Sequence, residues 1–134
     1  MGKAKQVSWR DAKPASIVFV SGPEEYLADR AMRSIRDQLK TLDAGLEVHE
    51  LLAGDYTPGQ LIAVASPSLF MEPRLVLITG MEKCSDALIE DGLSYLLEPS
   101  LETTIVLRHN SSSVRGMKLI DAIRASDNAV EIAC

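Results

Sequence analysis

A length of 134 residues allows about one domain with a hydrophobic core of its own. Apolar residues make up 46% and charged residues 25% of the sequence, as in an ordinary soluble globular protein, and only 4% aromatic residues leave the core to aliphatic side chains. The formal net charge of -5 argues against a stand-alone nucleic-acid-binding protein, which normally carries an excess of basic surface.

The first predicted strand follows a basic N-terminal segment. Residues 1–14 lack an apolar stretch, so we interpret them as a flexible segment and not as a signal peptide. Residues 16–20 form a continuous apolar run, which is the pattern of a strand buried on both faces. This strand opens the predicted domain, residues 15–134.

A long amphipathic helix is predicted next, from about residue 24 to residue 42. Its apolar residues recur every three or four positions and form one stripe: Leu27, Ala31, Ile35, Leu39 and Leu42. Four basic residues fall on the opposite side by the same period: Arg30, Arg33, Arg36 and Lys40. Two interpretations of this basic stripe stay open, a solvated face or a contact with a partner.

The second strand and second helix come from a more polar part of the chain. Residues 47–52 are the most polar of the predicted strands, which suits a sheet edge. Thr57, Pro58 and Gln60 have the spacing of a capping box with Thr57 as the N-cap, so a helix should begin there. Pro67 should end or kink this helix, although Ser66 and Pro67 fit a separate short turn equally well.

The remaining elements continue the alternation of strands and helices. Strands are predicted at 74–79, 104–107 and 129–133, and helices at 86–97 and 114–125. Regular alternation with buried strands is typical of a parallel sheet covered by helices on both faces, a three-layer α/β sandwich. Because the chain stops directly after an apolar strand, we expect it to be a fragment of a longer protein.

The loop after the first strand is where this fold class would bind a nucleotide, at the carboxyl end of the sheet. A P-loop there would read Gly-x-x-x-x-Gly-Lys-Ser/Thr and would cradle phosphate with backbone N–H groups and a Lys. The loop has Gly22, but Pro23 lacks an N–H and no Lys is present. Glu24 and Glu25 add negative charge that would repel a polyphosphate. We therefore predict no nucleotide hydrolysis and no cofactor.

Other catalytic arrangements are not supported by the sequence. His109 precedes a polar loop that contains Ser111, but a Ser/His pair in such a loop is most often structural, and His49 lies on the predicted edge strand. A response-regulator receiver would need an Asp after the third strand, where Thr79 and Gly80 stand. The predicted domain is therefore not an enzyme.

The sequence also argues against a metal-binding protein, a disulfide-stabilised fold and a membrane-spanning protein. Cys84 and Cys134 have no metal-like spacing and cannot form a disulfide scaffold, so we interpret both as reduced thiols. No apolar run approaches the roughly 18 residues that span a bilayer. We expect a cytoplasmic protein without a metal site or membrane contact.

Several of these stretches resemble the DNA polymerase III delta subunit of bacterial clamp loaders. Residues 22–27 look like its degenerate P-loop, and residues 68–70 followed by 74–76 look like its clamp-binding element and next strand. Residues 104–107 and 116–119 fit the strand and helix that come after. The resemblance extends over about residues 17–134 and implies an AAA+-type, P-loop-NTPase-like sandwich whose five-stranded parallel sheet has the order 5-1-4-3-2 and no functional P-loop.

The resemblance also implies a role in DNA replication. The domain would be the N-terminal part of the delta subunit, which binds the beta sliding clamp through an apolar wedge and opens the ring. The full-length subunit would work with the delta prime and gamma/tau subunits in the DNA polymerase III holoenzyme and would meet DNA through the assembled loader. Two alternatives remain: another nucleotide-free α/β protein-interaction module, and an NTP-binding domain.

The resemblance assigns the wedge to Leu69 and Phe70, with Pro67 and Ser68 as the adjoining clamp-binding residues. Pro67 stands where the family often has a Met. Neighbouring Leu and Phe side chains on a short turn cannot both point into one core, and a Pro-fixed backbone would pre-organise them for a partner's pocket. The alternative is that one of the two caps the hydrophobic core between helix and strand.

Overall fold

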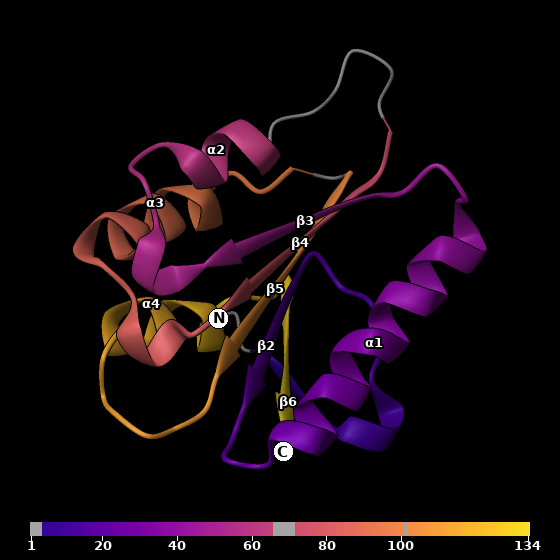
Figure 1. Ribbon diagram of the computed structural model, residues 1–134, viewed down its shortest axis with the longest axis horizontal. Helices are drawn as coiled ribbons and strands as arrows, with labels where there is room; N and C mark the ends of the chain where they lie inside the picture. The colour runs from indigo at the N-terminus through magenta and orange to yellow at the C-terminus, as the bar shows by residue number, and fades with distance from the viewer. Residues whose placement is uncertain (1–3, 66–71, 101) are drawn as a thin grey trace.

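The computed structural model describes residues 4–65, 72–100 and 102–134. Its centre is one sheet of six parallel strands in the order β1-β6-β2-β5-β4-β3 (Figure 1). The strands are β1 (Lys5–Ser8), β2 (Ile17–Ser21), β3 (Glu47–Leu52), β4 (Arg74–Thr79), β5 (Thr103–His109) and β6 (Ala129–Ala133).

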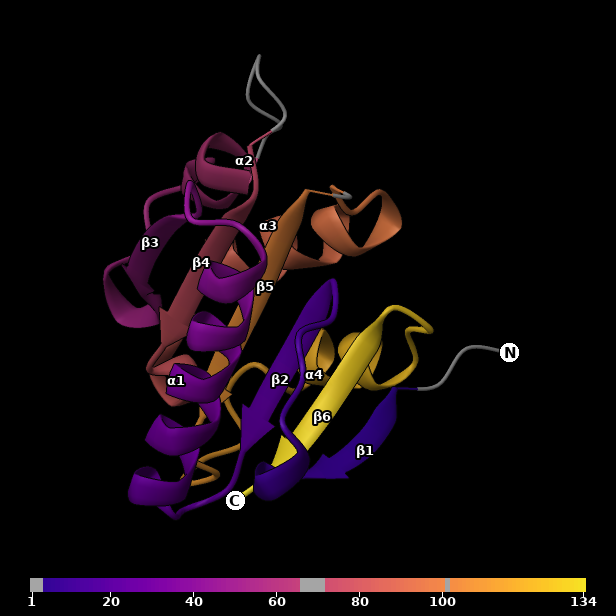
Figure 2. The ribbon, with the colours of Figure 1, turned by 90° about the vertical axis from the view of Figure 1, so that its right-hand side faces the viewer.

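Helices cover both faces of this sheet, so the predicted three-layer α/β sandwich is confirmed. The long helix α1 lies on one face, and the other three α-helices lie on the opposite face (Figures 1 and 2). The α-helices are α1 (Glu25–Leu42), α2 (Gln60–Ala65), α3 (Asp86–Leu97) and α4 (Met117–Arg124). Short 3-10 helices are η1 (Trp9–Asp11), η2 (Ala53–Asp55) and η3 (Met81–Lys83).

The predicted count of five strands is wrong, because the sheet has a sixth strand at its β6 edge. This strand, β1, forms within residues 1–14 and pairs in parallel register from Lys5 opposite Val130 to Ser8 opposite Ala133. It has no apolar run and is mostly exposed, so its sequence carries no strand pattern. Backbone pairing with β6 holds it in place. The five predicted strands keep the expected order 5-1-4-3-2, with polar β3 at the opposite edge.

Two helices begin later than the sequence pattern suggests. Gly59 has a φ of +84°, so a turn precedes α2, and the helix begins at Gln60 rather than beside Thr57. One half of the predicted capping box is present, since Thr57 N–H donates to Gln60 Oε1 at 3.1 Å. Gly116 likewise has a φ of +84°, and α4 begins one residue after it.

The core has one part on each side of the sheet. Ala31 and Ile35 of the predicted α1 stripe are buried, but Leu42 is 80% exposed at the last residue of the helix. Ala28, which the stripe did not include, is buried completely. Small side chains at positions 28 and 31 let α1 approach the sheet closely, where it covers the apolar residues Val18, Val20, Leu75, Leu77, Val106 and Ile132.

Candidate functional site

The predicted wedge joins α2 to β4. Its residues Pro67, Ser68, Leu69 and Phe70 lie outside the described residues. The structure does describe the two ends to which this segment is attached, at residues 65 and 72, and those ends determine where the segment can reach. The site is therefore built from the contacts that hold these two ends.

The last turn of α2 is fixed by two side chains that donate hydrogen bonds to its terminal carbonyl oxygens. Thr103 Oγ1, buried at the start of β5, donates to the carbonyl oxygen of Ala65 at 3.0 Å. Arg74 Nη1, at the start of β4, donates to the carbonyl oxygen of Val64 at 3.1 Å. The terminal carbonyls of a helix have no partner inside the helix, so these two bonds satisfy them and join α2 to the sheet.

The first turn of α2 is tied to α3 through Asp91. Tyr56 Oη donates to Asp91 Oδ2 at 2.5 Å, and the backbone N–H of Gly59 donates to the same oxygen at 2.8 Å. Tyr56 Oη in turn accepts from the N–H of Leu61 at 2.9 Å. Burial, together with the hydrogen bond to Asp91, raises the pKa of Tyr56 to about 12, so the hydroxyl keeps its proton. Both ends of α2 are thus held.

The first residues after residue 72 are already hydrogen-bonded to the neighbouring strands of the sheet. Glu47 N–H donates to the carbonyl oxygen of Pro73 at 3.2 Å, and Arg74 N–H donates to that of Glu102 at 3.0 Å. Arg74 Nε also forms an ion pair with Glu47 Oε2 at 3.1 Å. Sequence patterns could not reveal these contacts, because the bonds that hold α2 join residues up to 38 positions apart. The candidate wedge is therefore a short segment between two fixed ends.

The predicted degenerate P-loop follows the carboxyl end of β2, and two of its backbone N–H groups already have acceptors within the chain. Gly22 N–H donates to the carbonyl oxygen of His109 at 3.2 Å, and Glu24 N–H donates to that of Cys134 at 3.4 Å. Pro23, between them, has no N–H. Gly22 adopts a φ of +115°, and a Cβ at this position would lie 2.2 Å from the carbonyl oxygen of Cys134. The loop therefore packs against the chain's own backbone where a nucleotide-binding protein would receive phosphate.

A charged cluster lies directly before this loop. Glu131 on β6 is buried, and its two carboxylate oxygens accept from Arg124 Nε and Nη2 at 2.9 and 3.0 Å. Ser21 Oγ adds a third hydrogen bond to Glu131 at 2.9 Å. Burial alone would raise the pKa of Glu131, but the hydrogen bonds from Arg124 and Ser21, with the positive charge of Arg124, lower it. The carboxylate is therefore ionised and joins α4 to the strands beneath the loop.

His109, Cys84 and Cys134, the other residues considered in the sequence, lie in surroundings that give them a structural role. His109 is buried; its Nδ1 accepts from the N–H of Ser111 at 2.9 Å, so Nε2 carries the hydrogen and donates to the carbonyl oxygen of Arg115 at 3.1 Å. Burial raises the pKa of both thiols, Cys84 and Cys134. Within residues 4–65, 72–100 and 102–134, no group of three His, Cys, Asp or Glu side chains could hold a metal ion.

These features define a class of protein: an all-parallel α/β sandwich with the strand order β1-β6-β2-β5-β4-β3, in which the loop after β2 donates backbone hydrogen bonds to the chain's own carbonyl oxygens. The fold is similar to that of the DNA clamp loader delta protein of Bacillus subtilis, with a TM-score of 0.58 at 18% sequence identity. The match covers 89% of this chain and 38% of that protein. The expected likeness to the delta subunit is thereby confirmed for the fold.

Comparisons by sequence add no further relatives. No family model and no curated protein matches the chain. In the part of the chain that the structure describes, none of the helices is long and apolar enough to cross a membrane.

Proposed function

We propose that this chain is the clamp-binding domain of a clamp loader delta subunit, which binds the beta sliding clamp through Leu69 and Phe70 and opens the ring during DNA replication. The observation that carries the proposal is the combination of a delta-like fold with a phosphate-binding loop closed by the chain's own backbone. A nucleotide-hydrolysing member of this fold class needs that loop free, whereas a subunit that acts by protein contact does not.

The surroundings of the predicted wedge are consistent with this role. The segment 66–71 leaves a helix whose last carbonyls are held by Arg74 and Thr103 and enters a strand fixed by its neighbours. Holding both ends lowers the conformational entropy that the segment loses on binding, which favours affinity. The domain has no enzymatic activity of its own in this proposal. In a full-length subunit its other partners would be the delta prime and gamma/tau subunits, and DNA through the assembled loader.

The direct test is to mix the purified 134-residue chain with a bacterial beta sliding clamp and to measure binding by calorimetry. We expect saturable binding and co-elution of the two proteins in gel filtration. A folded chain that does not bind the clamp would leave the alternative of an α/β module for a different protein partner and would reject the proposal.

The chain is expected to bind neither ATP nor ADP. The N–H groups of Gly22 and Glu24 already donate to carbonyl oxygens, and Glu24 and Glu25 place negative charge where the phosphates would lie. Calorimetric titration with each nucleotide in the presence of Mg²⁺ should give only the heat of dilution. Saturable binding at micromolar affinity would instead support the alternative of an NTP-binding domain.

Pro67→Gly is expected to weaken clamp binding by about 0.4–1 kcal/mol, because a Gly at this position has more conformational freedom to lose. Pro67→Met should tighten binding if the Met adds an apolar contact, as the family pattern suggests. Titration calorimetry with the clamp measures both variants, and Pro14→Gly, in the connection between η1 and β2, serves as a control. Unchanged affinity in both Pro67 variants would show that Pro67 only ends the helix.

A further inference from the structure

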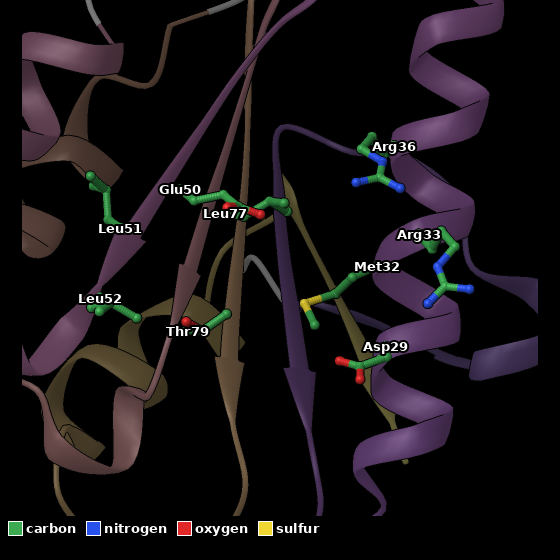
Figure 3. Close-up of a pocket in the computed structure, with 9 residues that line it drawn as sticks. All are labelled: Asp29, Met32, Arg33, Arg36, Glu50, Leu51, Leu52, Leu77 and Thr79. Carbon is green, nitrogen blue, oxygen red and sulfur yellow. The ribbon is translucent and has the colours of Figure 1, made fainter.

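A groove of about 550 Å³ lies between α1 and the strands β3 and β4 (Figure 3). Its position is towards the carboxyl ends of the two strands, whereas residues 65 and 72, which flank the predicted wedge, lie at the opposite end of β4. The groove is therefore a surface separate from the proposed clamp contact. It is lined by Asp29, Met32, Arg33, Arg36, Glu50, Leu51, Leu52, Leu77 and Thr79.

Two Arg residues in this groove have no partner among the residues that the structure describes. Arg33 and Arg36 make no ion pair and no hydrogen bond with any residue that the structure describes, and Arg36 Nε is buried without an acceptor. Figure 3 shows Arg36 and Met32 extending from α1 on the side that faces the strands. A buried N–H that has lost water and gained no acceptor costs free energy. A carboxylate in the groove would form charge-assisted hydrogen bonds with the N–H groups of Arg33 and Arg36 that remain accessible.

The other wall of the groove is an open sheet edge. Among the described strands, β3 pairs with β4 alone. Glu47 N–H points to β4, where it donates to Pro73, so by the alternation of a strand the backbone groups of Val48, Glu50 and Leu52 point away from the sheet. Leu52 is also 62% exposed. Such an edge can accept a further strand, whose backbone would pair with these free groups.

We propose that this groove binds an extended acidic segment of a partner protein, which pairs with β3 and places a carboxylate beside Arg33 and Arg36. Side chains two residues apart in a strand face the same side. An apolar side chain two residues from the acidic one would therefore also enter the groove, where it contacts Met32 and Leu52. The recognised pattern is acidic-x-apolar or its reverse. The proposal does not depend on clamp binding.

Nucleic acid fits the groove less well than a peptide does. Asp29 and Glu50 also line it, so a backbone with a negative charge at every phosphate would meet both carboxylates. A peptide can bring one carboxylate to the Arg side chains and present neutral groups elsewhere. The free backbone groups of β3 favour a peptide as well, since strand pairing needs alternating N–H and C=O groups.

The experiment uses the fluorescein-labelled heptapeptide Thr-Glu-Thr-Leu-Thr-Glu-Thr, which carries a Glu two residues to either side of its Leu. It is titrated with the 134-residue chain, and binding is measured by fluorescence polarisation. We expect saturable binding that weakens about tenfold or more in Arg33→Ala/Arg36→Ala, as expected when hydrogen bonds to a charged group are lost. Arg30→Ala/Lys40→Ala is the matched control, because it removes the same charge from α1 but neither residue lines the groove. This control should keep the affinity of the unchanged chain.

Two altered peptides test the chemistry of the occupant without changing the protein. A peptide with Gln in place of Glu should bind more weakly, and so should one with methylated backbone nitrogens, which cannot pair with β3. Absence of binding would overturn the proposal, as would equal affinity for the Gln peptide or equal binding by Arg33→Ala/Arg36→Ala. Displacement of the peptide by a single-stranded DNA oligomer would assign the Arg side chains to nucleic acid and would also overturn it.

Discussion

Replacing Leu69 and Phe70 together by Ala is expected to abolish most clamp binding while leaving the fold intact. Full burial of a Leu or Phe side chain contributes about 1.5–3 kcal/mol, and anchors in a partner's pocket often reach 2 kcal/mol or more. The double variant should therefore lose about 3–6 kcal/mol of binding free energy, on the order of a hundredfold to ten-thousandfold in affinity. Because an exposed wedge contributes little to folding, Tm should change by only a few degrees.

The alternative, in which these side chains cap the core, predicts the reverse pair of results. Buried Leu→Ala and Phe→Ala substitutions typically cost about 2–5 kcal/mol of stability each, so Tm would collapse. Leu97→Ala/Val114→Ala is a suitable control, since both side chains are exposed apolar groups on other parts of the surface. A double variant at 69 and 70 that melts far below the unchanged chain, or that is folded and still binds the clamp fully, would reject the wedge.

Glu131→Gln, at the end of β6 beneath the predicted degenerate P-loop, should lower the free energy of unfolding. It removes the charge that accepts two hydrogen bonds from Arg124 and one from Ser21, and hydrogen bonds to a charged group contribute about 1.5–3 kcal/mol. Arg124 is 43% exposed and regains water in the variant, so we expect a total loss of about 1.5–3 kcal/mol at neutral pH. Urea unfolding measures this difference.

The pH dependence of that loss follows from the lowered pKa of Glu131. A carboxyl group with a lower pKa in the folded state stabilises the fold above its unfolded pKa, about 4.3, and this contribution disappears as pH falls through the folded pKa. The gap between Glu131→Gln and the unchanged chain should therefore be full at pH 7 and narrow in acid below about pH 4. Glu90→Gln, at an exposed position on α3, should show no comparable gap. A gap at Glu131 that is the same at both pH values would exclude this ion pair as its cause.

The sequence predicted the bounds of three strands and one helix correctly. Strands β3, β4 and β6 begin and end where the pattern predicted, and so does α3, whose N-cap Ser85 accepts from the N–H of Leu88. Strand β1 escaped prediction because its stability comes from backbone pairing with β6, more than a hundred residues further along the chain. Such pairing leaves no periodic pattern in a segment that is largely exposed.

The contacts around the two predicted sites could not be predicted from the sequence. Pro23, Glu24 and Glu25 predict a loop without a phosphate cradle, but only the fold shows that the N–H groups of Gly22 and Glu24 donate to His109 and Cys134. In the same way, nothing local in the sequence indicates that Thr103 would hold the end of α2. Contacts of this kind depend on strand order, which brings distant residues to one edge of the sheet.

Hydrogen–deuterium exchange tests the central claim, that segment 66–71 contacts the clamp, most directly. The chain is compared alone and with an excess of beta clamp. We predict slower exchange in peptides that cover residues 66–71 and the end of α2, with little change in β3 or in the part of α1 that lines the groove. A complex that forms while exchange at 66–71 stays unchanged, or that protects only another surface, would contradict the account.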